Sequence, residues 1–220
     1  MSEATATPKQ PTTAAQRARV RRILDVATTL VTGGGEEALQ MSDLPELADV
    51  SLAALYRYFP SKQHLLFAVV ENHLGSILAR TEPQESATAS ARERIAAHLL
   101  RGFHVDQRVP GFGLTVRRLS TLADPAFSAE RQRLAQLHAD IVLRAVGPIT
   151  ERQNETLGVV LTASNAAVVH WFAGIITADE ARFQILLACR LLDLPEEQIA
   201  ADRNTAERGA RQVSSGSSVT

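Results

Sequence analysis

The sequence predicts an all-α protein of about nine helices, in which an N-terminal three-helix helix-turn-helix domain precedes a larger C-terminal helical domain. Apolar residues recur at spacings of three and four along most of the chain, which is the period of helices that bury one face. Runs of β-branched residues are few and the chain has no Asn-Gly dipeptide, so the usual signals of strands and hairpins are weak. Between residues 42 and 59 we expect two short helices joined by a tight turn, which is the helix-turn-helix arrangement.

The composition is that of an ordinary globular protein. The chain has 220 residues, of which 45% are apolar and 21% charged, and its net charge is −1. Any binding to nucleic acid must therefore come from a local cluster of cations. One such cluster lies near the N-terminus, in a stretch without acidic residues, and consists of Lys9, Arg17, Arg19, Arg21 and Arg22.

The single cysteine, Cys189, excludes an intramolecular disulfide and a cysteine-based zinc site, and it suits a protein of the reducing cytoplasm. Residues 1–15 are polar and lack the apolar core of a signal peptide, so we expect a disordered, partly basic lead-in. Residues 156–178 carry no full charge, but Asn165 and His170 interrupt the run. We interpret it as a buried helix and expect no membrane span.

Glycine and proline set the boundaries of the first two helices. The first helix is predicted over residues 16–32, because the glycines at 33–35 supply the left-handed conformations that end a helix. These glycines lack the preceding strand and the following Gly-Lys-Ser/Thr of a phosphate-binding loop, so we assign them no chemistry. The second helix is predicted to start at Ser42 as N-cap, with Pro45 at the third helical position, where proline loses no hydrogen bond.

Capping and composition place the next boundaries. A third helix is predicted over residues 51–59, and Ser61 is a good N-cap for a linking helix over residues 61–80. Pro, Ser, Thr and Ala accumulate at residues 81–93, which indicates a loop. We therefore expect a lead-in at 1–15, a helix-turn-helix domain at 16–62, a second domain at 81–203 and a disordered tail at 204–220.

The second domain is predicted to hold five helices, separated at proline-containing dipeptides. Two of them start with the pattern of a capping box, Thr150 with Gln153 and Thr177 with Glu180. The predicted helices are 91–107, 112–123, 125–146, 151–176 and 178–193.

The third helix presents two different faces. One face is predicted to pack inward, with Leu44, Leu47, Val50, Leu55 and Phe59 against the first helix. The other face, together with the end of the helix, offers phenol and guanidinium groups that can reach phosphates and base edges. Its residues are Leu52, Ala53, Tyr56, Arg57 and Tyr58.

Lys62 lies in the first turn of the linking helix, where a cation opposes the helix dipole at a cost of about 0.3–1 kcal/mol. A bound phosphate would reverse this penalty, because free amides at a helix start also attract anions. Alone, Lys62 is an ordinary surface lysine. Beside Tyr56, Tyr58 and the basic cluster it favours a DNA-binding surface.

The stretch "LYRYFPSKQHLL", preceded by "ADVS" and by the helix "RRILDVATTLV", resembles the N-terminal domain of the TetR family of bacterial transcriptional regulators. The match covers residues 16 to about 75. It implies a homodimer, most often a repressor, that binds a palindromic operator in double-stranded DNA and is released by a small-molecule effector. The resemblance also assigns roles: Tyr56 touches thymine or phosphate, Tyr58 and Lys62 hold phosphates, Arg57 faces the backbone or a base, and Arg17 and Arg21 extend the phosphate footprint.

Two departures from the family pattern concern the turn and the reading face. Members of the family often have a longer polar residue, glycine and threonine where this chain has Leu52, Ala53 and Ala54. Base reading is therefore expected to depend on thymine methyl groups and DNA shape. Asp49 stands where the family usually has glycine, and aspartate tolerates the left-handed conformation of a tight turn.

The resemblance implies that the helices at 151–176 and 178–193 pair with those of a second subunit. It also implies that the helices before them enclose a ligand pocket. We expect Val160, Ala163 and Ala167, with Gly174, to face the partner. The predicted pocket walls are apolar with few polar anchors, as is usual for small-molecule sites, although each residue alone is more often plain core. They are Phe103, Leu114, Leu119, Leu122, Leu137, Asn165 and Trp171.

The segments "RLSTLADPAFSAE" and "SNAAVVHWFAG" are similar to the C-terminal domain of TetR-family regulators of sterol catabolism, which implies a large apolar or acyl-CoA-like effector. The histidines lack the spacing of a metal site and no catalytic motif is present, so we expect no metal, cofactor or catalytic residue. Two alternatives stay open. In the first, the second domain serves only dimerisation or binds a protein partner. In the second, the chain is an enzyme or small-molecule carrier that keeps a helix-turn-helix.

Overall fold

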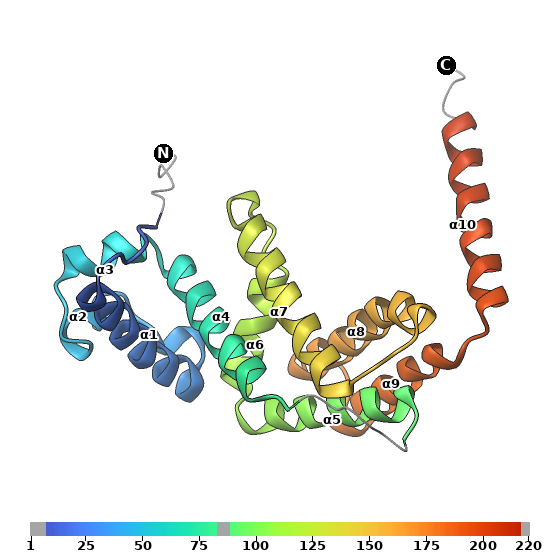
Figure 1. The fold of residues 1–220 in the computed structure, drawn as a ribbon, viewed down its shortest axis with the longest axis horizontal. Coiled ribbons are helices and arrows are strands. Elements are labelled where there is room, and N and C mark those ends of the chain that lie inside the picture. The colour runs from blue at the N-terminus through green and yellow to red at the C-terminus, as the bar shows by residue number, and fades with distance from the viewer. Residues whose placement is uncertain (1–7, 83–88, 217–220) are drawn as a thin grey trace.

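The computed structural model describes residues 8–82 and 89–216. All regular structure in these two ranges is helical, which confirms the all-α prediction. In Figure 1, α1–α4 gather at one end of an elongated molecule, α5–α9 at the other, and α10 projects from the body. The α-helices are α1 (Ala14–Gly34), α2 (Leu44–Leu47), α3 (Leu52–Tyr58), α4 (Lys62–Arg80), α5 (Ala91–Arg108), α6 (Pro110–Ser120), α7 (Ser128–Val146), α8 (Glu151–Phe172), α9 (Ala178–Cys189) and α10 (Glu196–Gly216), and 3-10 helices cover Glu36–Ala38, Pro125–Phe127 and Arg190–Asp193.

Helix α1 is longer than predicted at both ends. Thr13 and Gln16 form a capping box, so the helix starts at Ala14. At the other end only Gly35 adopts a left-handed φ, of 70°. The two glycines before it are helical, and one left-handed glycine is enough to end the helix.

Helix α2 starts later than predicted. Its N-cap is Asp43, not Ser42, and the helix has four residues. The Ser42 hydroxyl donates a hydrogen bond to the Asp43 carboxylate, 2.7 Å away, and so does not cap the helix. Pro45 consequently sits at the second helical position, where its missing amide still costs no hydrogen bond.

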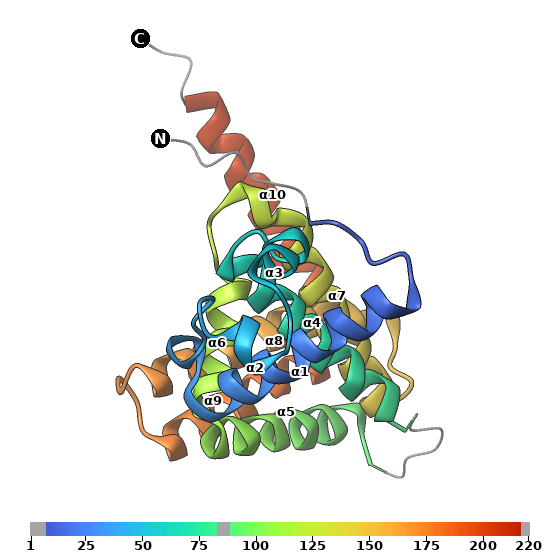
Figure 2. The same cartoon turned by 90° about the vertical axis from the view of Figure 1, so that its left-hand side faces the viewer.

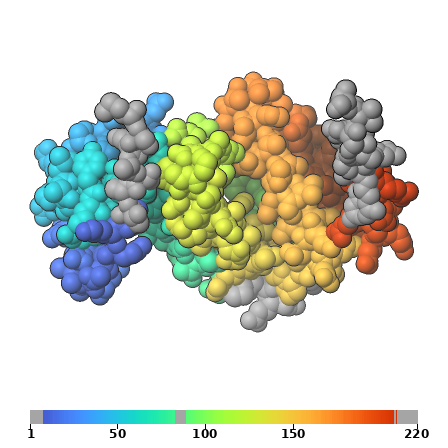
Figure 3. Space-filling model, turned by 90° about the horizontal axis from the view of Figure 1, so that it is seen from above, coloured from blue at the N-terminus to red at the C-terminus, as the bar shows by residue number. Residues whose placement is uncertain are grey.

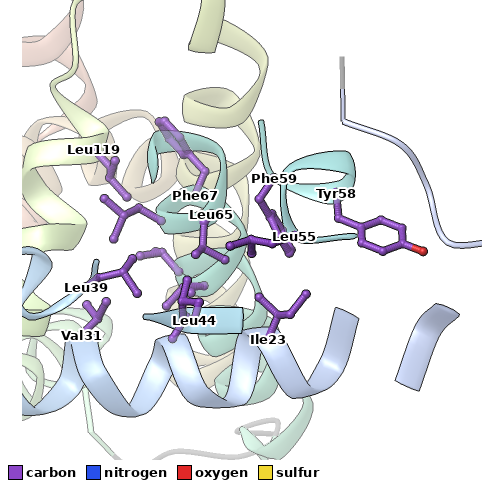
Figure 4. Close-up of a cluster of buried hydrophobic side chains, with 14 of the residues drawn as sticks. Ile23, Val31, Leu39, Leu44, Leu55, Tyr58, Phe59, Leu65, Phe67 and Leu119 are labelled. Carbon is purple, nitrogen blue, oxygen red and sulfur yellow. The ribbon is translucent and has the colours of Figure 1, made fainter. Parts of the chain in front are cut away.

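One apolar core underlies α1–α4 (Figure 4). Ile23, Leu44, Leu55 and Phe67 are among its fully buried members. Leu47 was expected in this core, but its side chain is exposed. The core also includes residues that follow the linking helix, namely Leu119 of α6, Phe127 of the 3-10 helix before α7, and Leu134 of α7.

A second apolar region lies among α5, α7, α8 and α9 and divides into two clusters. Val160 and Ala167 of α8 are buried there, so the prediction that they face a partner subunit is wrong. The other two residues named for that face, Ala163 and Gly174, are exposed. The error is one of rotation about the helix axis, because α8 is apolar on most sides and its periodicity does not distinguish one buried side from another.

The caps of the second region differ in detail from the prediction. Thr150 and Gln153 form the expected capping box of α8. At α9 the box is half formed: Thr177 accepts from the Glu180 amide, but the Glu180 carboxylate instead accepts from Gln184. A further box, Ser90 with Glu93 at the start of α5, was not predicted.

The structure shows a helix, α10, continuing to Gly216, where the sequence suggested disorder from residue 204. Alanine, glutamate and arginine dominate its first half, and these residues favour helix even when few contacts support it. The Arg203–Glu155 ion pair of 3.3 Å connects it to α8. Within the described ranges, none of the helices combines the length and apolarity that crossing a bilayer requires.

Helices α1 and α6 approach each other through glycines. A Cβ atom on Gly111 would lie 2.6 Å from the backbone nitrogen of Gly35. At this distance one of the two backbones would have to shift to make room for it. Beside this contact, Arg118 of α6 forms an ion pair of 2.7 Å with Glu36. Helix α6 is therefore held against the N-terminal end of the molecule along its length.

We expect Gly111→Ala to destabilise the protein by about 1–3 kcal/mol, because the added methyl group collides with backbone atoms. Gly102→Ala is the matched control, since a Cβ at this exposed position of α5 meets nothing within 4 Å. It should stabilise the protein by up to about 1 kcal/mol through helix propensity. Urea denaturation of both variants measures the difference, and equal stabilities would contradict the close packing of α1 on α6.

Candidate nucleic-acid interface and ligand site

The turn between α2 and α3 has a tight, stabilised geometry. Asp49 is the one non-glycine residue of the described ranges with a positive φ, of 51°, as expected for the position. Arg22 of α1 donates from Nε to the carbonyl of Ala48 and from Nη2 to the carbonyl of Asp49, both at 3.2 Å. Arg22 had been grouped with the basic cluster, but in the structure it satisfies carbonyl groups of the turn.

Helix α3 turns one face to solvent. Ser51 caps it by accepting from the Ala54 amide. Leu52 is 52% and Tyr56 45% exposed, and this end of the molecule faces the viewer in Figure 2, with α3 uncovered. Ala53 and Arg57 are also exposed, whereas Ala54 is half-buried.

Tyr58 occupies a different environment from Tyr56. Its side chain is only 3% exposed and belongs to the first core, although Figure 4 shows its hydroxyl directed away from the core centre. Arg57 Nη2 donates to that hydroxyl at 2.8 Å, and the guanidinium lies 5.0 Å from the ring centroid. Tyr58 thus supports α3 and positions Arg57.

The start of α4 lies next to the end of α3. Lys62 is its first helical residue, half-buried, and the first turn contains no acidic side chain. Ser61 Oγ accepts from the His64 amide and lies 2.8 Å from His64 Nδ1. The cation and the free amides at this helix start form a positively charged site that lacks an internal anion among the residues of that turn.

Further cations flank these helices. Arg21 and Arg17 are exposed on α1, and Arg17 donates to the carbonyl of Thr12 at 2.9 Å. The backbone amide of Lys9 donates to the carbonyl of Arg57 at 3.2 Å. The segment before α1 is therefore attached to the C-terminal end of α3, which adds the exposed Lys9 to the same basic surface.

The seven predicted pocket residues are not brought together. Phe103 and Trp171 meet, with ring centroids 5.1 Å apart, and Asn165 is half-buried on the same helix as Trp171. Leu119 and Leu122 instead pack with the first core. Leu137 is half-buried on α7 and Leu114 is exposed on α6.

Figure 3 shows a hollow, here named the inner cleft, between the start of α7 and α8, with α5 visible at its bottom. Two histidines of α5 and α7 have lowered pKa values. Burial, then the charge of Arg101 and the neighbouring His138, lower the pKa of His98 to about 4. Burial, then the charge of Arg117, lower the pKa of His138, although this side chain is exposed.

A bidentate ion pair joins α5 to α6. Arg117 donates to both carboxylate oxygens of Asp106, at 2.7 and 3.2 Å, and to the carbonyl of Gly113 at 3.0 Å. Burial raises the pKa of Asp106 more than the nearby Arg117 charge lowers it. Sequence periodicity did not indicate this pair, because a contact between two different helices leaves no local pattern.

A recess of about 440 Å³ lies elsewhere on α5, toward α7, and none of the predicted pocket residues lines it. Arg94 crosses this region and donates to the carbonyls of Ala89, Val146 and Pro148. The described part of the chain contains no group of three or more histidine, cysteine or carboxylate side chains placed to hold a metal ion.

Helices α8 and α9 expose an apolar surface that no described residue covers. Along α8 it consists of small or apolar side chains such as Val159, Ala163 and Ala166, and along α9 of larger ones. The exposed apolar side chains of α9 are Phe183, Leu186 and Leu187. The two helices that carry these side chains pack against each other.

Comparison with known proteins agrees with this architecture. A model of the N-terminal part of bacterial regulatory proteins of the tetR family matches residues 23–69. The chain is 32% identical to the HTH-type transcriptional repressor KstR of Mycolicibacterium smegmatis, over 84% of this chain and 91% of that protein. The crystal structure of a TetR transcriptional regulator from Rhodococcus sp. RHA1 superposes with a TM-score of 0.67 and 26% identity, over 82% of this chain and 97% of the other. The FadR regulator of Bacillus subtilis, in complex with stearoyl-CoA, shares the fold at 16% identity with a TM-score of 0.54, over 79% of this chain and 96% of the other.

Acidification should destabilise the protein through His98. Below pH about 6.5 the unfolded chain binds a proton that the folded protein takes up only near pH 4, so stability present above pH 6.5 is lost as pH falls through this window. His98→Gln should reduce the slope of the free energy of unfolding against pH in this window. The reduction should be less than about 1.4 kcal/mol per pH unit, which is the limit for one proton. Urea denaturation between pH 7 and 4 tests this, with the exposed His104→Gln on the same helix as control. Parallel profiles of wild type and His98→Gln would contradict it.

Proposed function

The chain belongs to the tetR family of bacterial regulatory proteins, and we propose that it is a cytoplasmic repressor that binds a palindromic operator as a homodimer and is released by a largely apolar effector. The relatives are transcriptional regulators, which supports a role without catalysis. The observation that carries the proposal is the exposed face of α3, where Tyr56 and Arg57 stand beside the positive start of α4.

Helix α3 enters the major groove in this proposal, as the second helix of a helix-turn-helix does. Tyr56 touches a base edge or a phosphate, and Leu52, Ala53 and Ala54 offer apolar contacts to thymine methyl groups. Reading by these three residues adds few hydrogen bonds, so DNA shape contributes much of the specificity.

Phosphate contacts anchor the helix on both sides. Lys62 and the free amides around it hold one phosphate, and Arg17 and Arg21 of α1 hold others. Tyr58 takes part through its hydroxyl: it accepts from Arg57, and its own proton is free to reach a phosphate. The buried ring then fixes the direction of both groups.

The apolar surface on α8 and α9 is the dimer interface of this proposal. Exposed Phe183, Leu186 and Leu187 next to small residues of α8 would pack against the same helices of a second copy, which is self-complementary as a two-fold interface requires. Dimerisation then places two copies of α3 in successive major grooves, about 34–36 Å apart.

The inner cleft is the effector site of this proposal. The ring of half-buried Trp171 lies 5.1 Å from that of buried Phe103 in this half of the molecule. FadR, which shares the fold, was crystallised in complex with stearoyl-CoA. A coupling of about 1–3 kcal/mol between effector and DNA suffices to change operator affinity five- to 150-fold. A largely apolar or acyl-CoA-like effector fits these surroundings.

Selection of bound genomic fragments should enrich a palindrome. On that palindrome we expect Lys62→Gln to lower affinity roughly tenfold and to reduce the slope of log affinity against log salt by about one, since one phosphate contact is lost. Tyr56→Ala should weaken binding by about 1–3 kcal/mol.

Arg108→Gln is the matched control for charge, because Arg108 is exposed on α5, outside the proposed DNA surface. It should leave both affinity and salt slope unchanged. Failure to enrich a palindrome, or equal effects of Lys62→Gln and Arg108→Gln, would overturn the proposed DNA-binding surface.

The double variant Phe183→Glu/Leu187→Glu should be monomeric at micromolar concentration, because two pairs of charges would be buried in a two-fold interface. Sedimentation velocity measures this, and operator affinity should fall with dimerisation. Leu114→Glu, an equally exposed leucine on α6, is the control and should remain dimeric. A monomeric wild type would contradict the assigned interface.

A further inference from the structure

The ion pair between Asp106 and Arg117 joins two of the helices of this half of the molecule and approaches a third. Asp106 comes from α5, Arg117 from α6, and the Arg117 guanidinium lies 5.5 Å from the ring centroid of Phe172 on α8. The charge of Arg117 also acts on His138 of α7. A ligand that enters between these four helices therefore meets this pair.

The pair is recessed without being sealed. The side chains of Arg117 and Asp106 retain 17% and 14% of their exposure. Arg117 Nε is buried and donates no hydrogen bond within the described structure, although its other nitrogens are well occupied. The arginine thus has donor capacity beyond what Asp106 uses.

Arg117 is the arginine of this region that approaches Phe172 of α8. Arg101, near His98, and Arg182, which pairs with Asp179, are further cations of this half. His98 and His138 are neutral at physiological pH for the reasons given above, and the nearby aromatic rings carry no charge. The bidentate geometry of the present partner shows that a planar carboxylate fits the guanidinium here. Because burial raises the pKa of Asp106, this carboxyl group can take up a proton when a ligand carboxylate replaces it, so that no unpaired charge is left buried.

We propose that Arg117 recognises the carboxylate of an otherwise apolar effector, which replaces Asp106 as its partner. The inference rests on the proposed function, in which the inner cleft is the effector site. It assigns the ligand class: an amphipathic monocarboxylic acid, with its acidic group near α6 and its apolar body against the aromatic side chains.

The position of Arg117 links such a ligand to the DNA-binding end. The next residue, Arg118, pairs with Glu36, and Leu119 is buried in the first core. A Cβ atom on Gly113 would lie 2.3 Å from Asp106 Oδ1, so α6 and the present Asp106 conformation fit without spare room. Displacement of Asp106 changes the contact that sets the position of α6.

Trp171 provides the readout, because it is the single tryptophan of the chain and its ring lies 4.7 Å from that of Phe172. Its fluorescence is followed while the full-length protein is titrated with decanoate or with decanol, which has the same chain length and no charge. For wild type we expect decanoate to bind at least roughly tenfold tighter than decanol, since the charge-assisted pair is available to the acid alone.

Two variants of opposite effect test the assignment. Arg117→Gln should abolish the preference for decanoate, whereas Asp106→Asn, which removes the internal competitor, should tighten decanoate binding about tenfold and leave decanol unchanged. Arg118→Gln, on the adjacent exposed arginine, is the matched control and should keep the wild-type preference. Circular dichroism melting of each variant establishes that it is folded. If Arg117→Gln does not fold, the decanoate affinity of Asp106→Asn tests the inference by itself.

Equal binding of decanoate and decanol by wild type, or no binding of either, overturns this inference, as does a preference that survives in Arg117→Gln. The proposed function is tested separately, because enrichment of a palindrome needs no ligand. Palindrome binding without carboxylate preference would overturn the assignment of Arg117 alone.

Discussion

A seven-residue helix does not hold its shape in water by itself, so the surface presented by α3 depends on the core beneath it. Leu55, Tyr58 and Phe59 are buried against that core, and Arg22 binds the two carbonyl groups of the preceding turn. These contacts fix the positions of the exposed Tyr56 and Arg57. The groups that would meet DNA are therefore placed by buried side chains and by the turn, and Tyr58 has both roles in the proposal, because its ring is buried while its hydroxyl points away from the core.

The same core joins the two ends of the molecule. Leu119, Phe127 and Leu134 follow the linking helix in sequence but pack with α1–α4, and glycines let α6 approach α1 within backbone contact distance. Arg117 and Arg118, adjacent on α6, pair with acids on opposite sides, Asp106 and Glu36. Because packed cores do not deform continuously, a change at one side of α6 is felt at the other.

Local patterns predicted most of the fold. Spacing of apolar residues and capping residues such as Ser61 and Thr150 placed the helices to within a few residues, because these signals act within one turn of helix. The left-handed Asp49 was predicted for the same reason. The N-cap of α2 was assigned to the wrong neighbour, since two adjacent polar side chains compete for that role by bonding to each other.

The failures concern contacts between elements. The periodicity of α8 did not reveal that Val160 and Ala167 face the core. No local pattern indicates that Arg22 donates hydrogen bonds to the turn or that the ring of Tyr58 is buried. Leu119 was assigned to the pocket because it is apolar and in the second half, while the structure gives it to the first core. The Asp106–Arg117 pair escaped notice for the same reason. Such pairings are decided by how helices cross, which a single sequence does not display.

The exposure of Leu52 and Ala53 makes these two positions tolerant of substitution. They contribute little to the core, so other side chains at these positions would leave the fold intact, and no internal hydrogen bond has to be broken first. A polar replacement would add new recognition without removing an old bond. Single substitutions at these positions could thus change the DNA sequence that the protein prefers, while the core and the turn that support α3 stay the same.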